Sequence, residues 1–382
     1  MDSRPKYHCY LFVTFVLGIL LAGCWSSFSN SSDGSRYANS IFALALQDNY
    51  LWLCGAAGPK RLNLTNNTIE KFEDSVSCEH LLVARNGWIW ESVDELVRYF
   101  DGKVWRDPQL ESSIRYRGDY RLSETTDGSI WIGGSSLRSF DPQTNQLTTV
   151  IPELPEPTPT PGPPQTGFIA TSPSPGYIGP VFEAADGALW YNNQFEGLVR
   201  WDRKSNSRQL WSEKDFGGTF PIPTKFIQAG DGSIWVGMVH GVHRFHDGHW
   251  QTWSLPGEGT RYSREQGDFQ VIDMIEDRDG KIWVMFQYAG VAVWDGSTWK
   301  PVWRKSDRVQ LMHSIYGTSF DEVWIGFLHD TTIKYYNGKL KTYPSAVRVF
   351  LETPDHRLFG GGSEGLFLYN RTLDQWELYP VQ

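Results

Sequence analysis

The chain has 382 residues, of which 40% are hydrophobic and 15% aromatic, and it carries a formal net charge of −9. This composition is typical of a large soluble β domain and excludes an intrinsically disordered or membrane-embedded chain. The negative charge, without a compensating cluster of Lys and Arg, also excludes nucleic acid as an expected partner, because phosphate backbones are bound by basic surfaces.

The amino-terminal segment has the pattern of a signal peptide. Basic residues precede an apolar run from Leu11 to Ala22, which is shorter than a membrane-spanning helix requires. The run ends in LAGC, which resembles the bacterial lipobox and implies cleavage just before Cys24 and a lipid on its thiol. An ordinary cleaved signal or an uncleaved anchor is the alternative. We expect residues 1–23 to be the signal and residues 24–40, rich in Ser and Asn, to be a flexible tether to the membrane.

Eight short motifs recur along residues 41–382. Each places a turn before an apolar and an aromatic residue: DNYLW, NGWIW, DGSIW, DGALW, a second DGSIW, DGKIW, DEVW and DHRLF. The aromatic residues stand 35 to 48 positions apart, except for one step of 59, and are Trp52, Trp90, Trp131, Trp190, Trp235, Trp283, Trp324 and Phe359. A period of about forty residues indicates a repeat architecture.

Each repeat contains four short segments with the alternation and the bounding turns of β-strands. An apolar run precedes the motif, and a second strand pair follows around an Asp- or Asn-containing turn, as in VRYFDGKVW and VHRFHDGHWQTW. Four antiparallel strands repeated in this way are typical of a β-propeller blade. The sequence therefore predicts an all-β fold of eight four-stranded blades over residues 41–382. Seven blades are the alternative, because the first turn, QDNY, is degenerate.

The recurring residues have structural roles in such a ring. The Asp-Gly pairs supply the positive φ of a tight hairpin, and the following Trp offers a large apolar area to the neighbouring blade. Three repeats depart from the pattern. The first lacks the turn glycine, the seventh places Glu322 where the glycine is expected, and the last has Phe359 instead of Trp.

The motifs DGSIWIGG, DGSIWVG and DEVWIG, with their partners GLVRWD and GVHRF, resemble the two-component regulator propeller repeat. This repeat forms the periplasmic ligand-sensing domains of bacterial hybrid histidine kinases. The resemblance covers residues from about 41 to 382 and implies a propeller that recognises a ligand outside the cytoplasm. The chain stops after its last repeat, without the spanning helix and kinase of those proteins, so we expect binding without signalling in the same chain.

Two of the four cysteines, Cys54 and Cys78, remain once the signal peptide and the lipidated residue are set aside. Cys54 lies near the end of the first repeat's second strand, and Cys78 lies near the start of the second repeat's first strand. In adjacent antiparallel sheets these positions fall at the same end, and an exported compartment permits oxidation. Either a disulfide between two blades or two free thiols are expected.

Residues 151–180 interrupt the repeat and account for the step of 59 residues. The segment is rich in Pro, with Thr, Ser and Gly between, so it cannot donate regular ladder hydrogen bonds. We expect an exposed, polyproline-like loop inserted in the propeller, and recognition of a partner is its alternative role.

Four histidines at a spacing of three, His240, His243, His246 and His249, raise the question of a metal site. Their segment has β-branched and aromatic runs bounded by Asp-Gly turns, so it predicts strands rather than a helix. Side chains three residues apart on a strand point to opposite faces, so the four imidazoles are not expected to converge. The sequence predicts no metal and no other cofactor.

The loops between the second and third strands vary most between repeats. In a propeller they share one face of the ring, opposite the Asp-Gly turns. The residues five positions after the motif aromatics should be equivalent around this face: Ala57, Glu95, Ser136, Phe195, His240, Tyr288, His329 and Glu364. We predict a binding mouth formed by His240, Tyr288, His329 and Glu364, because rings together with polar groups suit a saccharide or another polar small molecule. Solvated loop tips without a ligand are the alternative.

The sequence contains no nucleophile-elbow, phosphate-loop, zinc-protease or dinucleotide motif. It therefore favours a non-enzymatic, lipid-anchored propeller of the cell envelope that binds a polar small molecule or an envelope protein. An enzyme is the alternative, since bacterial streptogramin lyases resemble this repeat class and act with a histidine-centred site and Mg²⁺. His240, His329 and Glu364 could imitate that site, although the lyase motif is not matched residue by residue.

Overall fold

The computed structural model describes residues 39–72, 77–93, 96–109, 120–134, 136–152, 178–193, 196–218, 221–253, 270–287, 289–304, 311–329 and 331–380. The chain divides into two compact units, Met1–Gly34 and Ser35–Gln382, and the described residues belong to the second. The expected signal peptide, Cys24 and most of the tether lie outside the described residues, as do Glu95, Phe195, Tyr288 and residues 153–177 of the proline-rich insertion. Within the described residues, no helix is long and apolar enough to cross a membrane.

The described chain forms eight antiparallel sheets, each of four consecutive strands. Blade 1 comprises β1 (Ile41–Gln47), β2 (Tyr50–Gly55), β3 (Lys60–Asn63) and β4 (Ile69–Lys71). Blade 2 comprises β5 (His80–Val83), β6 (Ile89–Val93), β7 (Leu96–Phe100) and β8 (Trp105–Arg106). Blade 3 comprises β9 (Arg121–Glu124), β10 (Ile130–Gly133), β11 (Leu137–Asp141) and β12 (Gln146–Ile151). Blade 4 comprises β13 (Phe182–Glu183), β14 (Leu189–Asn193), β15 (Gly197–Asp202) and β16 (Ser207–Trp211).

A short 3₁₀ helix, η1 (Glu213–Phe216), leads into the second half of the ring. Blade 5 comprises β17 (Pro223–Gln228), β18 (Ile234–Met238), β19 (Gly241–His246) and β20 (His249–Trp253). Blade 6 comprises β21 (Val271–Glu276), β22 (Ile282–Phe286), β23 (Gly290–Trp294) and β24 (Trp299–Trp303). Blade 7 comprises β25 (Met312–Gly317), β26 (Val323–Phe327), β27 (Thr332–Tyr336) and β28 (Lys339–Tyr343). Blade 8 comprises β29 (Val347–Glu352), β30 (Leu358–Gly362), β31 (Leu366–Asn370) and β32 (Gln375–Leu378).

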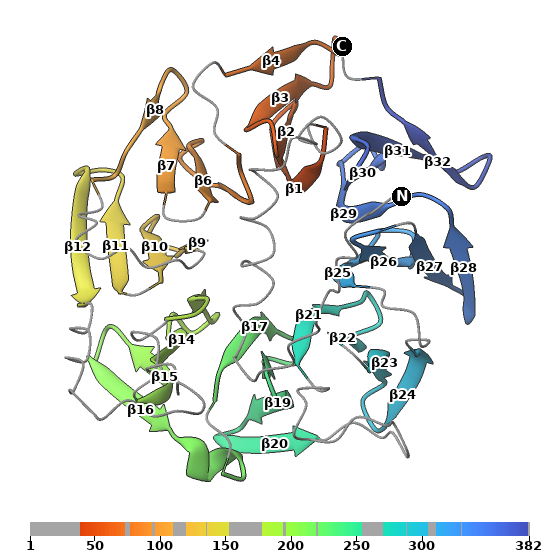
Figure 1. Cartoon of the computed structure of the whole chain (residues 1–382). Helices are drawn as coiled ribbons and strands as arrows, with labels where there is room; N and C mark the ends of the chain where they lie inside the picture. The colour runs from red at the N-terminus through yellow and green to blue at the C-terminus, as the bar shows by residue number, and fades with distance from the viewer. Residues whose placement is uncertain are drawn as a thin grey trace, which may run out of the picture. The chain divides into compact units, whose positions relative to one another are not determined.

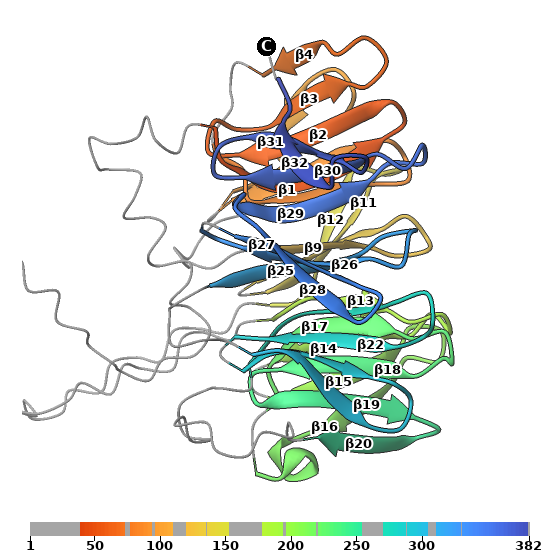
Figure 2. The same cartoon turned by 90° about the vertical axis from the view of Figure 1, so that its right-hand side faces the viewer.

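The blades surround one axis, with the first strand of each blade innermost and the fourth outermost (Figure 1). Seen edge-on, the strands run across the thickness of the ring (Figure 2). The prediction of eight blades is confirmed, and the degenerate first repeat forms a complete blade. Strand β1 contacts β29 and β30 of the last blade, so the ring closes through packing and not through a shared sheet.

The first hairpin of the regular repeats uses the positive φ that the Asp-Gly motif predicts, as at Gly232 with a φ of 83°. In blades 7 and 8, Asp321 (φ 59°) and His356 (φ 65°) take this conformation. Short polar residues enter the left-handed region more readily than bulky ones. The structure therefore corrects the expected place of Glu322: Asp321 occupies the glycine position, and Glu322 follows it as a buried carboxylate that accepts a 2.7 Å hydrogen bond from Arg371.

The motif aromatics form the core between the blades. All eight are between 0% and 3% exposed: Trp52, Trp90, Trp131, Trp190, Trp235, Trp283, Trp324 and Phe359. Trp190, for example, stacks on Trp211 of its own blade at 5.4 Å and meets Phe245 of the next blade edge-on at 5.2 Å. Offset and edge-on ring pairs of this kind add to the burial of apolar area. The repeated Trp therefore joins neighbouring blades.

A second repeated contact, which we call the blade clasp, joins the last residue of an innermost strand to the hairpin of the preceding blade. The backbone N–H groups of Arg85, Thr126, Ala185, Gly230 and Ser319 donate, over 2.5 to 3.1 Å, to the side chains of Glu124, Glu183, Gln228, Glu276 and Glu352, respectively. Blade 2 has Val83 at the clasp position, where no acceptor is available. At this joint a disulfide links Cys54 to Cys78, whose Cα atoms lie 5.1 Å apart.

Candidate functional site

Antiparallel pairing divides the connections of each blade between two faces of the ring. The first-to-second and third-to-fourth hairpins form the turn face, and the second-to-third loops and the blade-to-blade connections form the loop face. His240 (between β18 and β19), His329 (between β26 and β27) and Glu364 (between β30 and β31) are exposed on the loop face. They belong to three different blades, so their side chains start from separate positions around the rim.

The four histidines spaced by three divide between the two faces. His240 stands at the loop face, while His246 and His249 pair across the hairpin at the turn face. Between them, His243 is 3% exposed, and its Nδ1 lies 3.0 Å from Thr252 Oγ1. Burial, with a smaller effect from nearby His240, lowers the pKa of His243 to about 4. Among the residues that the structure describes, no group of three His, Cys, Asp or Glu side chains is placed to hold a metal ion.

A cluster that sequence reasoning missed lies where the innermost strands begin, at their loop-face ends. We call it the axial cluster, and it consists of His80, Arg121, Lys225, Asp273, His313 and Arg348. These residues lie within the first three positions of β5, β9, β17, β21, β25 and β29. Because the innermost strands surround the ring axis (Figure 1), the cluster collects side chains from six blades.

Irregular pairing affects four of these positions. In blades 7 and 8 the innermost strand skips one residue in its pairing, and the skipped residues are His313 and Arg348. In blades 5 and 6, Lys225 and Asp273 directly follow the skipped residue. A β-bulge bends the strand and redirects side chains, and bulges are frequent beside binding sites. The bulges thus take these side chains out of the regular alternation of the strand.

Contacts within the axial cluster cross the joints between blades. Lys225 Nζ lies 2.8 Å from Asp273 Oδ1, and Asp273 Oδ2 accepts the backbone N–H of Ile315 at 3.2 Å. Arg121 Nη1 lies 3.4 Å from His80 Nε2. These contacts therefore link blades 5, 6 and 7 in one place and blades 2 and 3 in another.

Burial keeps both imidazoles of the axial cluster neutral near pH 7. Burial lowers the pKa of His80 to about 3, and Arg121 and His313 act in the same direction. Burial also lowers the pKa of His313 to about 4, with Arg348 assisting and Asp273 opposing. His313 of blade 7 is thus among the causes that lower the pKa of His80 in blade 2. The charge of the cluster thus comes from three cations and one carboxylate.

His313 has an unsatisfied ring nitrogen. Its Nδ1 is buried without a hydrogen-bond partner in the described part of the chain. An unsatisfied buried polar atom costs about 1–3 kcal/mol. Such atoms are rare in native proteins and require an explanation, of which ligand binding is one.

A signal for the axial cluster exists in the sequence. When the eight innermost strands are aligned on their clasp position, His80, Arg121, Lys225 and Asp273 stand three residues before it. His313 and Arg348 stand four residues before it. Other repeats have Leu44, Pro180 or Val349 at the first of these positions. An alignment of the repeats therefore exposes the polar substitutions, although it does not reveal the bulges.

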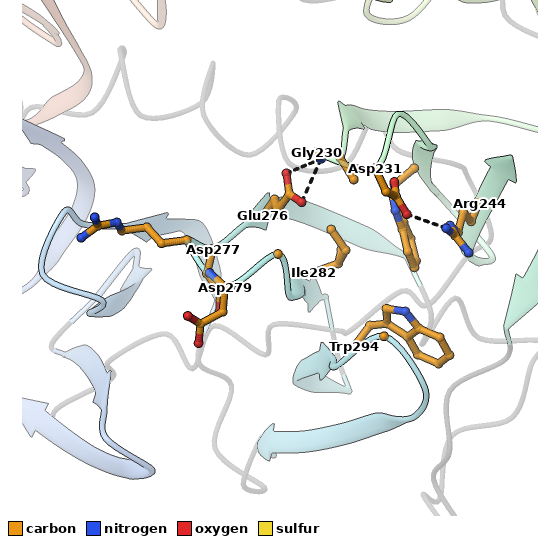
Figure 3. Close-up of a pocket in the computed structure, with 13 residues that line it drawn as sticks. Gly230, Asp231, Arg244, Glu276, Asp277, Asp279, Ile282 and Trp294 are labelled. Carbon is orange, nitrogen blue, oxygen red and sulfur yellow. Dashed lines mark hydrogen bonds and ion pairs between the residues drawn. The ribbon is translucent and has the colours of Figure 1, made fainter.

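The turn face carries two cavities between neighbouring blades. One, of about 540 Å³, lies between blades 5 and 6 (Figure 3), and its walls include Asp231, Arg244, Glu276, Asp279, Trp235 and Trp294. The other, of about 510 Å³, takes the equivalent place between blades 4 and 5.

The charged groups of these cavities are engaged in the scaffold. Asp231 accepts a hydrogen bond from Arg244 at 2.6 Å, and Glu276 holds the backbone N–H of Gly230 at 2.9 Å, as the dashed lines of Figure 3 show. The pair Asp186 and Arg200, 2.5 Å apart, repeats the first contact in the other cavity. Because the same contacts return in successive blades, we interpret the two cavities as a consequence of how the repeats pack. We therefore take the axial cluster as the candidate functional site.

Comparison with known proteins identifies the fold. No protein-family model matches the sequence, and no curated protein matches it. A solved streptogramin B lyase is similar with a TM-score of 0.52 and 14% identity, over 75% of this chain and 90% of that one. The computationally designed protein Ika8 is similar with a TM-score of 0.57 and 14% identity, over 86% and 94% of the two chains.

The extracellular domain of a putative hybrid two-component system from B. thetaiotaomicron is also similar, with 12% identity and a TM-score of 0.47 over 89% of this chain. The chain spans 46% of the length of that domain. At 14% identity the likeness to the lyase and to Ika8 is one of fold alone and does not transfer a function.

Proposed function

We propose that the chain is a non-enzymatic, ligand-binding propeller of the bacterial cell envelope, whose loop face receives a polar molecule such as a saccharide, or a protein partner. The observation that carries the proposal is the axial cluster. Removing charged groups from water costs free energy. The repeats with Leu44 and Pro180 at the equivalent position contribute no residue to the cluster and form blades as well, so the ring does not require these charges.

The loop residues support the same face. His240, His329 and Glu364 are exposed on the face where the axial cluster lies. Imidazole and carboxylate groups at a rim, above charged groups nearer the axis, provide the convergent polar contacts by which small-molecule sites orient their ligands.

Two features support a location outside the cytoplasm. The sequence ending at Cys24 resembles a lipobox, and the disulfide between Cys54 and Cys78 belongs to a class of bonds that persists in oxidising compartments. Lipid anchoring is tested by growth with labelled palmitate: the wild type should incorporate the label, and Cys24→Ser should not. Equal labelling of the two proteins, or no label in either, would contradict the anchor.

Binding at the loop face is tested by a thermal-shift screen of the purified protein against neutral and acidic saccharides, followed by calorimetry with each saccharide that binds. A combined His240→Ala and His329→Ala variant should lose affinity for that saccharide. The matched control is His246→Ala with His249→Ala, which removes two histidines from the turn face and should retain it. Unchanged affinity of the loop-face variant contradicts the proposed site, and a screen without any binding saccharide contradicts the saccharide class.

A lyase on the same scaffold is the second candidate function, and the observation behind it is the similarity of fold to a streptogramin B lyase. Incubation of the protein with a streptogramin B and Mg²⁺ separates the two candidates. Ring opening that is lost in the His240→Ala, His329→Ala variant supports the lyase, whereas unchanged substrate supports binding without catalysis.

A further inference from the structure

We propose that Asn337 is a modification site, at which the side-chain amide is lost spontaneously to give aspartate and isoaspartate. Asn337 and Gly338 form the two-residue turn between β27 and β28, and the flanking residues Tyr336 and Lys339 pair with each other. Third-to-fourth hairpins belong to the turn face, so this inference is independent of ligand binding at the loop face.

The reaction needs only the chain itself and water. The backbone nitrogen of Gly338 forms a bond to Asn337 Cγ, while the bond between Cγ and Nδ2 breaks. The proton of the attacking N–H leaves with the amide nitrogen as ammonia. Water then adds to either carbonyl group of the resulting cyclic imide and opens the ring, which gives aspartate or isoaspartate. Glycine favours the ring closure, because it has no Cβ beside the attacking nitrogen and adopts conformations closed to other residues.

The two reacting groups of this turn are exposed and unrestrained. Both Asn337 and Gly338 are exposed to solvent. In the part of the chain that the structure describes, neither the side-chain amide of Asn337 nor the N–H of Gly338 makes a hydrogen bond. The amide therefore turns toward the Gly338 nitrogen without the loss of a contact.

The chain contains a second Asn-Gly pair, Asn86 and Gly87, in the first hairpin of blade 2, and hydrogen bonds hold it in place. Asn86 Oδ1 accepts the N–H of Trp88 at 2.9 Å, and the N–H of Gly87 donates to the carbonyl oxygen of Ala84 at 2.8 Å. The carbonyl oxygen of Gly87 accepts a 2.5 Å hydrogen bond from Gln47 Nε2 of blade 1. Ring closure at Asn86 therefore requires that the bonds to Trp88 and Ala84 break first, which raises its barrier.

The fold already accommodates aspartate in a turn of this kind. Blade 5 has Asp247 and Gly248 in a two-residue turn between its third and fourth strands. Their φ angles are 50° and 79°, and those of Asn337 and Gly338 are 49° and 75°. We therefore expect the aspartate product to keep the hairpin and the blade intact.

The modification changes the charge of the hairpin. Strands β27 and β28 contain three lysines and no acidic residue: Lys334, Lys339 and Lys341. Loss of the amide places a carboxylate at the tip of this basic hairpin. Isoaspartate also lengthens the backbone of the turn, but β28 is the outermost strand of its sheet and pairs on one side only. We therefore expect both products to remain folded as a closed ring.

Peptide mapping by mass spectrometry tests the proposal. The purified protein is kept in a mildly alkaline buffer, folded and in urea, until Asn86 of the urea-unfolded chain has converted. In the folded protein, Asn337 should convert at least about ten times faster than Asn86, because two hydrogen bonds protect Asn86. In urea the two sites should convert at similar rates, because both precede glycine. Equal rates in the folded protein, or an unchanged Asn337 at this time, overturns the proposal.

Variants connect the chemistry to a charge form of the whole protein. The incubated wild type should yield an acidic species on ion exchange that elutes with Asn337→Asp. This species should be absent from Asn337→Ser and present in the matched control Asn86→Ser. Asn337→Asp should melt within about 2 °C of the wild type, because Asp247 occupies the equivalent turn position. An acidic species that persists in Asn337→Ser, or a much lower melting temperature of Asn337→Asp, contradicts the assignment.

Discussion

The turn face and the loop face of this ring both carry many polar side chains, but they use them differently. On the turn face the same types return from blade to blade, as in the clasp residues. A basic residue also stands opposite the motif Trp in four blades, in the pairs Trp52–Arg61, Trp190–Arg200, Trp235–Arg244 and Trp324–Lys334. On the loop face the side chains change with every blade. Repetition thus marks the residues that stacking of the blades requires.

Strand β21 carries a carboxylate at each end, one at a recurring position and one at a position that does not recur. Glu276, at its turn-face end, accepts the Gly230 N–H, as clasp residues do in other blades. Asp273, at its loop-face end, lies 2.8 Å from Lys225 of the preceding blade, and no other repeat has a carboxylate at the equivalent position in the sequence. A carboxylate's role in this protein is therefore indicated by whether its position recurs, more than by its residue type.

The largest effect is expected at a recurring core position. Trp190→Ala should lower the free energy of unfolding by about 3–5 kcal/mol, because it leaves a cavity between two blades. Urea denaturation measures this loss. Leu210→Ala on strand β16 of the same blade, where the side chain is 53% exposed, should change the stability by less than about 0.5 kcal/mol. Equal losses of unfolding free energy in the two variants would contradict the conclusion that recurring residues hold the blades together.

The joint between blades 1 and 2, which has no clasp, should depend on its disulfide. Cys54→Ala should cost about 3 kcal/mol, because the bond between Cys54 and Cys78 closes a chain segment with a sequence separation of 24. Reductant should destabilise the wild type by a similar amount and leave the variant unchanged. Titration of both thiols in denaturant without reductant would show that the bond does not form.

His243 should make the stability depend on pH, because it is a non-recurring residue with a structural role. Burial lowers its folded-state pKa to about 4, so the neutral ring stabilises the fold fully above its ordinary pKa of 6.5. This contribution declines as the pH falls toward 4, and we expect it to be about 2 kcal/mol smaller at pH 5 than at pH 7. His243→Gln should unfold with a correspondingly flatter pH dependence. An identical slope in both proteins would contradict the shift.

The clasp itself should make a moderate contribution. Glu276→Ala leaves the Gly230 N–H without its acceptor and should cost about 1–2 kcal/mol. Glu276→Gln is the matched control, because Gln228 performs the same role in blade 5, and it should keep most of the stability. If Gln is as damaging as Ala, charge and not hydrogen bonding holds the joint.

The smallest effect on stability is expected at the rim. The combined His240→Ala and His329→Ala variant should unfold within about 0.5 kcal/mol of the wild type, because both side chains are exposed on loops. Thermal and urea unfolding test this directly. A large loss of stability would make these histidines structural and end their assignment to a binding rim.

The sequence predicted the ring well because its determinants are local. A turn, an aromatic residue two or three positions later and a second hairpin recur about every forty residues, and no long-range knowledge is needed to count them. Even the degenerate turn of blade 7 obeys the rule, with Asp321 in the conformation expected of glycine. The blade motif therefore tolerates departures at single positions.

The candidate site was less predictable, because it depends on register and closure. His313 and Arg348 are set apart by bulges that follow from irregular pairing with the second strand, and no sequence period shows them. The cluster residues come from six blades, and the starts of their strands surround one axis only because eight blades close a circle. The sequence places loop residues such as His240 on the loop face, because each stands five positions after a motif aromatic such as Trp235. It does not show which of these side chains come into contact.

Each blade is one uninterrupted run of the chain, and the first and last blades meet without exchanging a strand. Duplication or deletion of a single run of about forty residues therefore adds or removes a whole blade and leaves every remaining strand paired. In a ring closed by one blade that contains strands from both chain ends, duplication or deletion of that blade would have to involve two distant segments of the chain at once. Blade number in this lineage is thus open to change by one genetic step, constrained mainly by the angle at which neighbouring blades can pack.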